Sequence, residues 1–555
     1  MTDHLTIVLA QINPTVGAIR ANLDRVRDAR AGAAQRGADL VVFPELVATG
    51  YPPEDLVLKP LVLDLVEQSV AVLAGETADG GPALLLGTPW RLDGGLHNAV
   101  LLLDGGRIAA IRLKADLPNY GVFDEKRVFV AGPLPEPMVF RGVRLGVMIC
   151  EDMWTPAVAQ ALAGAGAELL VVINGSPFEV DKAGVRVDLA TRRVGETGLP
   201  LMYVNQVGGQ DELVFDGASF AIGADRALVA QAPGFCEHLL VMRWQRDAGR
   251  RWLCSGSEQA APVTGLAAIY QAMMVGLRDY VNKNRFPGVL LGLSGGIDSA
   301  LTAAVAVDAL GPDRVHAVLM PSPFTSDEST ADAIEAANLL GCKLDTLSIE
   351  PAMTAFDTML APAFAGTDSD ITEENIQSRL RGMLLMALSN KFGAMVLSTG
   401  NKSEMSVGYA TLYGDMCGGY SVLKDVYKTT VFKLARWRNQ NLPDDAEGPA
   451  GRVVPERVLT KAPTAELKHN QTDQDTLPPY EVLDDVLECL IEHEMGSTEI
   501  VARGHDPDIV NRVWHMLDRA EYKRRQAPPG VKITRRGFGK DRRYPITNRF
   551  LSVLA

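Results

Sequence analysis

The sequence predicts an α/β protein with two domains. Its 555 residues exceed what one hydrophobic core usually holds, and its composition, 47% hydrophobic and 22% charged, is that of a globular protein. Short apolar runs alternate with segments of helical spacing in both halves of the chain. This periodicity is lost over 246–264, so we expect domains over 1–245 and 265–555, joined by a connector.

In the first half, apolar runs predict short strands, and residues spaced three or four apart predict helices over Ala21–Arg36 and Thr155–Ala163. Asp-Gly-Gly at 93–95 and at 104–106 is typical of hairpin turns, so some strands should pair antiparallel. The result is a mixed α/β layered domain. Its predicted strands are Leu5–Ile12, Leu40–Phe43, Ala83–Gly87, Ala99–Leu103, Leu145–Ile149, Leu169–Ile173 and Leu201–Asn205.

The second half opens with a helix that begins near Leu266 and ends before Pro287. Strands and helices then alternate, which is typical of a doubly wound parallel sheet. We expect strands over 289–293, 315–320, 344–349 and 394–398, and helices over 300–310, 329–340 and 372–391. Ligands bind such sheets at the carboxyl ends of the strands, where Ser294 and Thr399 both fall.

A phosphate-sized turn, Ser294-Gly295-Gly296-Ile297-Asp298-Ser299, follows the first strand of the second half. Its adjacent glycines let backbone N–H groups approach an anion, and its serines and the following helix add donors. A carboxylate in such a loop would repel phosphate unless it held a cation, so Asp298 is a candidate magnesium ligand. The turn is neither a Walker loop nor a GxGxxG loop. We interpret it as a pyrophosphate-binding loop.

Charge and cysteine content limit the possible partners and location. The net charge of −14 argues against general binding of nucleic acid or anionic membranes, and no apolar run is long enough to span a bilayer. The six cysteines show no CxxC spacing, and no signal peptide is visible, so we expect a cytoplasmic protein. Residues 523–543 are strongly basic, which indicates either a local anion site or a salt-bridge surface between subunits.

Three reactive side chains in the first domain follow predicted strands. Glu45 ends one strand with a carboxylate, Lys114 ends another with an amine, and Cys150 ends a third with a thiol. This set suits thiolate attack on an amide: Glu45 would take the thiol proton, Cys150 would attack, and Lys114 would stabilise the oxyanion. Cys150 also precedes a predicted helix, whose positive end should lower the pKa of the thiol.

The contexts of these three residues resemble those of the nitrilase (carbon–nitrogen hydrolase) superfamily. The matching segments are Phe43-Pro44-Glu45, Lys114-Ala115-Asp116-Leu117-Pro118-Asn119-Tyr120 and Cys150-Glu151-Asp152-Met153-Trp154. The resemblance covers residues from about 5 to 245 and implies an α-β-β-α sandwich with a Glu–Lys–Cys triad. In the branch that uses glutamine, it implies that Tyr120, Ser176 and Lys182 hold the substrate.

The second half resembles the ATP-pyrophosphatase group, and the whole chain resembles the glutamine-dependent NAD synthetase family. The segments that carry this likeness include 294–299, 319–322, 398–404, 413–415, 424–428, 463–466 and 541–548. The likeness implies a Rossmann-like sheet, a homo-oligomer, and deamido-NAD on Asn375, Glu404 and Lys523. It implies ATP on Gly292, Leu293, Ser294, Gly295, Gly296, Ile297, Asp298, Ser299 and Thr399. Asp298 and Glu404 are the carboxylates at the two strand ends, so we expect them to hold Mg²⁺.

These expectations describe an enzyme with two sites. Glutamine hydrolysis at Cys150 would release ammonia, and the second site would adenylate deamido-NAD with ATP before ammonia displaces AMP. Lys402 and Lys428 are candidate phosphate contacts, although an exposed helix lysine is the alternative for each. Three other functions stay open: another amidotransferase of the ATP-pyrophosphatase group, an ammonia-only synthetase with an inert first domain, and a non-catalytic protein that binds nucleotide or RNA.

Overall fold

The computed structural model describes residues 2–469 and 471–550. The chain divides into two compact units, Met1–Gly265 and Leu266–Ala555, and each is described by itself. Within the described residues, no helix has the length and apolar character needed to cross a membrane.

Unit 1 contains a seven-stranded sheet in the order β15-β14-β1-β2-β3-β4-β5. The two Asp-Gly-Gly turns join β3 to β4 and β4 to β5, and both pairs are antiparallel, as predicted. The segment predicted as a connector contains β15, which pairs with β14. The strands of this sheet are β1 (His4–Gln11), β2 (Leu40–Val42), β3 (Ala83–Leu92), β4 (Gly95–Asp104), β5 (Arg107–Leu113), β14 (His238–Arg246) and β15 (Trp252–Ser255).

A second sheet of six strands, in the order β13-β12-β9-β8-β7-β6, completes unit 1 with a small β10–β11 hairpin. Its central strands β7, β8 and β9 are parallel, and all three were predicted. The strands are β6 (Met138–Phe140), β7 (Val143–Ile149), β8 (Leu169–Asn174), β9 (Leu201–Asn205), β10 (Val207–Gln210), β11 (Leu213–Asp216), β12 (Phe220–Ile222) and β13 (Leu228–Gln231).

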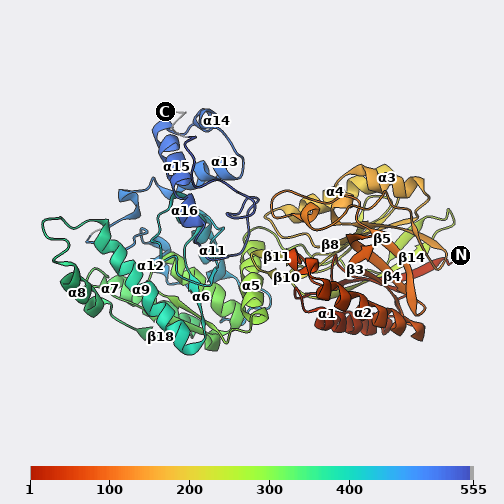
Figure 1. Cartoon of the computed structure of the whole chain (residues 1–555), viewed down its shortest axis with the longest axis horizontal. Coiled ribbons are helices and arrows are strands. Elements are labelled where there is room, and N and C mark those ends of the chain that lie inside the picture. Colours follow the sequence, from red (N-terminus) through yellow and green to blue (C-terminus); the bar gives the residue numbers. More distant parts are fainter. Residues whose placement is uncertain (1, 470, 551–555) are drawn as a thin grey trace. The chain divides into compact units, whose positions relative to one another are not determined.

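The two sheets pack face to face with helices outside, which confirms the predicted α-β-β-α sandwich. Alternate residues of one strand serve the two layers: Leu5, Ile7 and Leu9 join the core between the sheets, whereas Val8 and Ala10 join the core under α1 and α2. Figure 1 shows these two helices on one side of the sheets and α3 and α4 on the other. The helices are α1 (Ile19–Ala34), α2 (Pro60–Glu76), α3 (Pro156–Gly164) and α4 (Lys182–Thr197).

Unit 2 is built on a parallel five-stranded sheet in the order β18-β17-β16-β19-β20. The chain order reverses between β16 and β19, which is the topological switch point of a doubly wound sheet. The predicted Rossmann-like sheet is therefore confirmed, and the pyrophosphate-binding loop and Thr399 follow the two strands that flank the switch. The strands are β16 (Val289–Gly292), β17 (Val315–Leu319), β18 (Lys343–Thr346), β19 (Met395–Ser398) and β20 (Tyr420–Ser421).

Helices pack against this sheet, and further helices follow it in the chain. The predicted helices α5, α6, α7 and α9 are present, and α6 begins three residues earlier than expected, at Ile297. The helices of unit 2 are α5 (Gly265–Lys283), α6 (Ile297–Leu310), α7 (Asp327–Leu340), α8 (Glu350–Leu360), α9 (Ile371–Phe392), α10 (Lys402–Val407), α11 (Lys428–Gln440), α12 (Glu456–Thr460), α13 (Tyr480–Ile491), α14 (Ser497–Ala502), α15 (Pro507–Arg519) and α16 (Glu521–Arg524).

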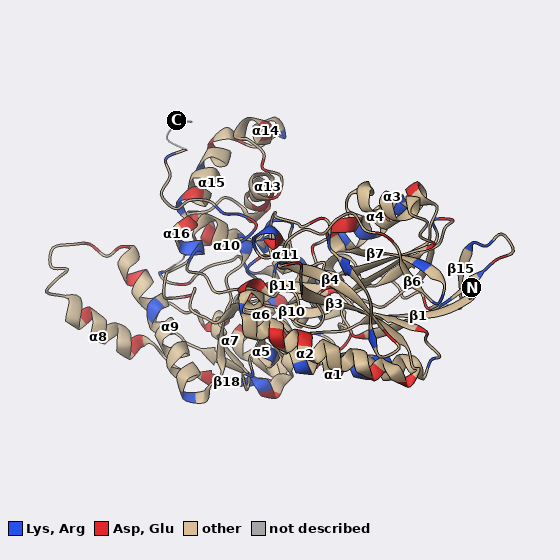
Figure 2. Cartoon of the chain, turned by 45° about the vertical axis from the view of Figure 1, so that its right-hand side comes forward, with Lys and Arg blue, Asp and Glu red and all other residues tan. Residues whose placement is uncertain are grey.

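The basic tail predicted over 523–543 makes extensive ion pairs within unit 2. Glu521 accepts hydrogen bonds from Arg524, Arg525 and Arg542, and Lys532 pairs with Asp541 at 3.4 Å. Figure 2 shows blue and red segments together at α16. Glu521, Asp541 and Glu494 thus compensate part of the tail's positive charge within unit 2.

A buried ion pair joins the two helices that bring charged groups to the loop after β16. Asp308 on α6 accepts hydrogen bonds from Arg438 on α11, Nε at 2.6 Å and Nη2 at 2.8 Å, and from the Tyr270 hydroxyl at 2.6 Å. The side chains of Asp308 and Arg438 are both fully buried. This pair fixes the relative position of α6 and α11, whose first turns carry Asp298 and Lys428.

Replacing Arg438 with Met should destabilise the protein by about 3–5 kcal/mol, because it leaves the Asp308 carboxylate buried without its cation. Arg452→Met is the matched control, since Arg452 pairs with Glu335 at a half-exposed surface site and should contribute less than about 1 kcal/mol. Denaturant unfolding of both variants measures the difference. Equal destabilisation by the two variants would contradict this assignment.

Candidate active sites

Glu45, Lys114 and Cys150 follow the ends of β2, β5 and β7, and all three are buried. The Lys114 Nζ lies 2.7 Å from Oε1 of Glu45. The other oxygen of Glu45 accepts a hydrogen bond from the Gly175 backbone N–H at 2.9 Å, and Asn98 donates to Oε1 at 2.7 Å. The carboxylate is therefore held on both oxygens, in the orientation that a general base needs.

Glu125 is a further charged residue of this site that the sequence analysis missed. Its two oxygens lie 2.8 and 2.9 Å from the Lys114 Nζ, and it accepts a hydrogen bond from the Tyr51 hydroxyl at 2.9 Å. Burial raises the pKa of Glu125 to about 7, although the Lys114 charge opposes the shift. For Lys114, burial opposes the charged form, but Glu125 and Glu45 outweigh it and raise the pKa.

The local sequence gives one weak signal for Glu125. It lies in a loop whose neighbours Val122, Phe123, Val128 and Phe129 pack into an apolar cluster. A carboxylate within such a loop is buried and needs a partner.

Cys150 begins a short 3₁₀ turn, Cys150–Met153, with a φ of +46° and 4% of its surface exposed. Burial, and then the charge of Glu45, raises the pKa of the thiol well above its ordinary value. The expectation that a following helix lowers this pKa is therefore wrong: α3 begins at Pro156, about where it was predicted, but burial and the charge of Glu45 outweigh the effect of its positive end. The thiol is protonated at neutral pH, so it needs a base before it can attack.

The buried carboxylate of Asp152 holds this turn in place. It accepts hydrogen bonds from the backbone N–H groups of Ile149, Ala115 and Asp116 at 2.9, 3.0 and 2.8 Å. Ile149 directly precedes Cys150, and Ala115 and Asp116 directly follow Lys114. One buried carboxylate thus ties the nucleophile to the cation.

The structure brings two of the three predicted glutamine-binding residues around one aromatic ring. The Tyr120 ring lies 5.5 Å from that of Phe123, and the Lys182 Nζ lies 5.9 Å from the same ring centroid. The Tyr120 hydroxyl donates to Glu151 at 3.0 Å, beside the nucleophile. Ser176 is buried after β8, where its N–H donates to Asn205 Oδ1 at 2.9 Å.

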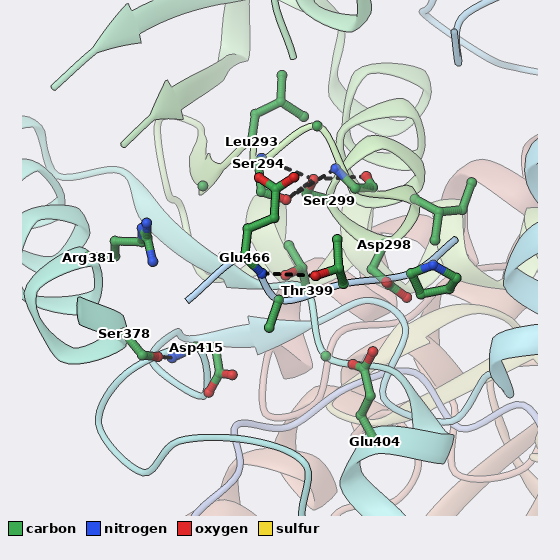
Figure 3. Close-up of a pocket in the computed structure, with 18 of the residues that line it drawn as sticks. Leu293, Ser294, Asp298, Ser299, Ser378, Arg381, Thr399, Glu404, Asp415 and Glu466 are labelled. Atoms are coloured by element: carbon green, nitrogen blue, oxygen red, sulfur yellow. Dashed lines mark hydrogen bonds between the residues drawn. The ribbon is translucent and has the colours of Figure 1, made fainter. Parts of the chain in front are cut away.

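In unit 2, all nine predicted ATP-binding residues line one pocket at the switch point of the sheet (Figure 3). The turn is held by its own serines: Ser299 Oγ donates to the Gly296 carbonyl at 3.0 Å, and the Gly296 N–H donates to Ser294 Oγ at 3.2 Å. Gly295 has a φ of +82°, and a Cβ there would lie 2.2 Å from the Ser329 carbonyl oxygen. Only glycine fits at this position.

Lys428 joins the two predicted magnesium ligands. Its Nζ lies 2.5 Å from Asp298 Oδ2 and 2.9 Å from Glu404 Oε1, and all three residues line the pocket. Burial raises the pKa of Glu404 to about 7, opposed by Lys428. Burial also raises the pKa of Asp415 to about 6, and it lowers that of Arg381, another cation in the pocket wall, to about 10.

Asn375 and Lys523, predicted to bind deamido-NAD, lie outside the residues that line this pocket. Both hold the segment 408–411, which contributes Tyr409 and Ala410 to the wall. Lys523 Nζ donates to the carbonyls of Gly408 and Ala410 at 2.7 and 2.6 Å, and Thr411 Oγ1 donates to Asn375 Oδ1 at 2.8 Å.

Lys402 is fully buried and pairs with Asp425 and Glu492 at 2.7 and 2.6 Å. It does not line the pocket, so it belongs to an internal ion-pair cluster, and the structure does not support the phosphate contact considered from the sequence.

Family models identify the class of protein that these two units define. The carbon-nitrogen hydrolase model matches residues 6–252, and the NAD synthase model matches residues 269–527. The chain therefore joins an amide-hydrolysing domain to a synthetase domain.

Curated relatives and solved structures match over the full length. The chain is 50% identical to the glutamine-dependent NAD(+) synthetase of Rhodobacter capsulatus and 47% identical to that of Xanthomonas campestris, with 99% of each chain covered. A solved glutamine-dependent NAD+ synthetase from Acinetobacter baumannii, in complex with ADP, is 42% identical, with a TM-score of 0.78 and 98% of each chain covered. The chain belongs to the glutamine-dependent NAD(+) synthetase family.

We predict that Glu125 makes glutamine hydrolysis sensitive to pH near neutrality. Only the ionised carboxylate accepts both contacts from the Lys114 ammonium, so kcat/KM for glutamine should rise with pH as Glu125 loses its proton at about pH 7. Glu125→Gln should lower the rate roughly a hundredfold and remove that limb of the profile. A profile unchanged by the substitution would contradict this role.

Proposed function

We propose that the chain hydrolyses glutamine at Cys150 and uses the released ammonia to convert deamido-NAD to NAD at the pocket of unit 2, with ATP cleaved to AMP and pyrophosphate. The observation that carries the proposal is the pairing, in one chain, of a buried Glu45–Lys114–Cys150 set with a phosphate-sized loop at a topological switch point. The full-length likeness to glutamine-dependent NAD(+) synthetases supports it.

At the first site, Glu45 takes the proton of the Cys150 thiol as the sulfur attacks the glutamine amide carbon. Lys114 stabilises the oxyanion, and the C–N bond then breaks as Glu45 returns the proton to the leaving ammonia. Water hydrolyses the thioester to glutamate. Because burial keeps the resting thiol protonated, the step depends on Glu45, whose oxygens are already held by Lys114 and Gly175.

The predicted glutamine contacts lie in two regions, one for each end of the substrate. Tyr120, which is exposed, and Lys182 lie around the Phe123 ring, and the charged amino-acid end of glutamine would bind there. Ser176 is buried beside Gly175, nearer the base, where the amide end would lie.

At the second site, an oxygen of the nicotinate carboxylate attacks the α-phosphorus of ATP, and pyrophosphate leaves. Ammonia then attacks the acyl carbon, and AMP leaves. The backbone N–H groups of the 294–299 loop and the first turn of α6 suit the phosphates, and Thr399 lies on the adjacent strand end. Lys428 and Arg381 supply positive charge to the pocket wall.

The residues of this pocket fit a magnesium ion that arrives with ATP. No group of three acidic, His or Cys side chains among the described residues forms a metal site alone, but Asp298 and Glu404 both present carboxylate oxygens to the pocket. Magnesium is usually held by one or two carboxylates together with substrate phosphates. It would neutralise phosphate charge during adenylate formation.

The alternative functions are less well supported. An inert first domain does not agree with an intact, buried Glu–Lys–Cys set. RNA binding through the basic tail is disfavoured by the net charge of −14, and several of the tail's arginines are already paired within unit 2. The cytoplasmic location and the homo-oligomeric state stay predictions from the sequence.

Cys150→Ala separates the two sites. The variant should lose NAD formation with glutamine as the nitrogen source and keep it with ammonium, because only the first site needs the thiol. Formation of NAD from deamido-NAD, ATP and magnesium measures both rates. Glutamine-dependent activity in the variant would refute the triad, and absence of NAD from wild type with either nitrogen source would refute the acceptor.

Gly295→Ala tests the phosphate loop. The added Cβ would lie 2.2 Å from Ser329 and take a φ of +82°, so the loop must shift, and NAD formation should fall about a hundredfold or more with either nitrogen source. Gly366→Ala is the control, since its φ is +85° but nothing lies within 4 Å of its added Cβ. Glutamine hydrolysis should survive in both variants. Equal synthetase activity in the two would rule out a special role for the loop.

A further inference from the structure

Arg186 is a buried cation next to the glutamine site that the reaction described above does not use. It lies on α4 with 2% of its surface exposed. Its Nη1 donates to both oxygens of Asp216, at 2.7 and 2.9 Å, so its charge is neutralised by a carboxylate at the end of β11. Burying such a pair is costly and seldom adds stability over an apolar pair, so its other contacts are informative.

The remaining nitrogens of Arg186 all bind the segment 175–177, which follows β8. Its Nε donates to Ser176 Oγ at 3.1 Å, and its Nη2 donates to the carbonyls of Ser176 and Pro177, each at 2.9 Å. Every nitrogen of the guanidinium is thus in use. The planar fork of arginine fixes the direction of these bonds, which a lysine could not reproduce.

The segment 175–177 serves both the substrate and the base. Ser176 is a proposed glutamine contact, and the N–H of Gly175 donates to Oε2 of Glu45 at 2.9 Å. A shift of the segment would therefore move Ser176, the proposed glutamine contact, and would release one oxygen of the general base.

Helix α4 carries both Arg186 and a proposed substrate contact. Lys182, the other proposed contact from this helix, lies four residues before Arg186, so the two stand one turn apart on the same side of α4. Figure 1 shows α4 on the outer side of the sheet that contains β8. One helix therefore carries both a proposed substrate contact, Lys182, and the residue that holds the segment 175–177, Arg186.

We propose that Arg186, held by Asp216, is a positioning residue for glutamine hydrolysis: it sets the segment 175–177 and through it both the Ser176 contact and the orientation of Glu45. The inference rests on the proposed function of the first site, because it concerns how that site is assembled. Arg186 does not touch the reacting atoms, since its donors are taken by Asp216, Ser176 and Pro177.

Arg186→Lys is the first test, because it keeps a positive charge opposite Asp216 but loses the fork. We expect KM for glutamine to rise roughly tenfold or more and kcat to fall, since lysine cannot make the two or three hydrogen bonds that the fork gives to the segment 175–177. NAD formation with ammonium should stay within about twofold of wild type, because it depends on unit 2. These rates are measured on the full chain.

Arg193→Lys is the matched control. Arg193 lies on the same helix, is 5% exposed and pairs with Glu196 at 3.1 Å. A change in glutamine kinetics that is the same in both variants would mean that α4 has only loosened, and would overturn the proposal.

Two further readouts distinguish positioning from a structural role. If Arg186 acts through Ser176, the effects of Arg186→Lys and Ser176→Ala on KM should be non-additive, whereas independent effects would add. The rate at which iodoacetamide labels Cys150, measured by mass spectrometry, reports how well Glu45 takes the thiol proton. Labelling should slow in Arg186→Lys but not in Ser176→Ala, because the latter keeps the hydrogen bond from the Gly175 N–H to Glu45. Additive effects on KM with unchanged labelling would overturn the proposal.

Asp216→Asn covers the case in which Arg186→Lys does not fold. It keeps the shape of the pair and the bonds from Arg186 to the segment 175–177 while removing the carboxylate charge, so KM for glutamine should rise in the same direction but less. An unchanged KM would overturn the proposal. Failure of this proposal can be told apart from failure of the proposed function. The latter would show as glutamine-dependent NAD formation in Cys150→Ala.

Discussion

The first site depends on one buried ammonium group. The Lys114 Nζ has no exposed surface and lies within 2.9 Å of carboxylate oxygens from Glu45 and Glu125. A lone ammonium could not stay charged at this depth, and neither could two carboxylates side by side. The positive charge of Lys114 and the negative charges of the two carboxylates stabilise one another, and the Cys150 thiol stays neutral beside them. The α-β-β-α sandwich supplies the rigid strand ends that hold this set together.

The second site repeats the same electrostatic arrangement with a different purpose. Lys428 lies between Asp298 and Glu404 as Lys114 lies between Glu45 and Glu125. The difference is access, because the Lys428 set lines an open pocket whereas the Lys114 set is enclosed. An enclosed set suits a proton transfer that must be shielded from water, and an accessible one suits a site where phosphate charge arrives and leaves with each turnover.

The sequence predicts the sheets and the reactive strand ends because both have local signals. Apolar runs identify β1, β7, β8, β9 and β16, and polar residues directly after them mark the ends that face a ligand. Glu125 does not follow a strand, and its partners, Tyr51 and Lys114, are distant from it or not recognisable as partners in the sequence, so no strand-end pattern identifies it. Lys402 and Lys428 look alike in sequence, and only their packing separates an internal ion pair from a pocket cation. The helices α2, α4, α8 and α10 and those after β20 were not predicted.

The protonated state of the resting nucleophile has a consequence for the chemistry of damage. Oxidation by peroxide begins at the thiolate, so a thiol whose pKa is raised by burial is a poor target between turnovers. Cysteine enzymes that keep a permanent thiolate accept that vulnerability in return for speed. Here the resting thiol is neutral and buried, so the attacking atom of the first site is shielded from such oxidants until Glu45 takes its proton.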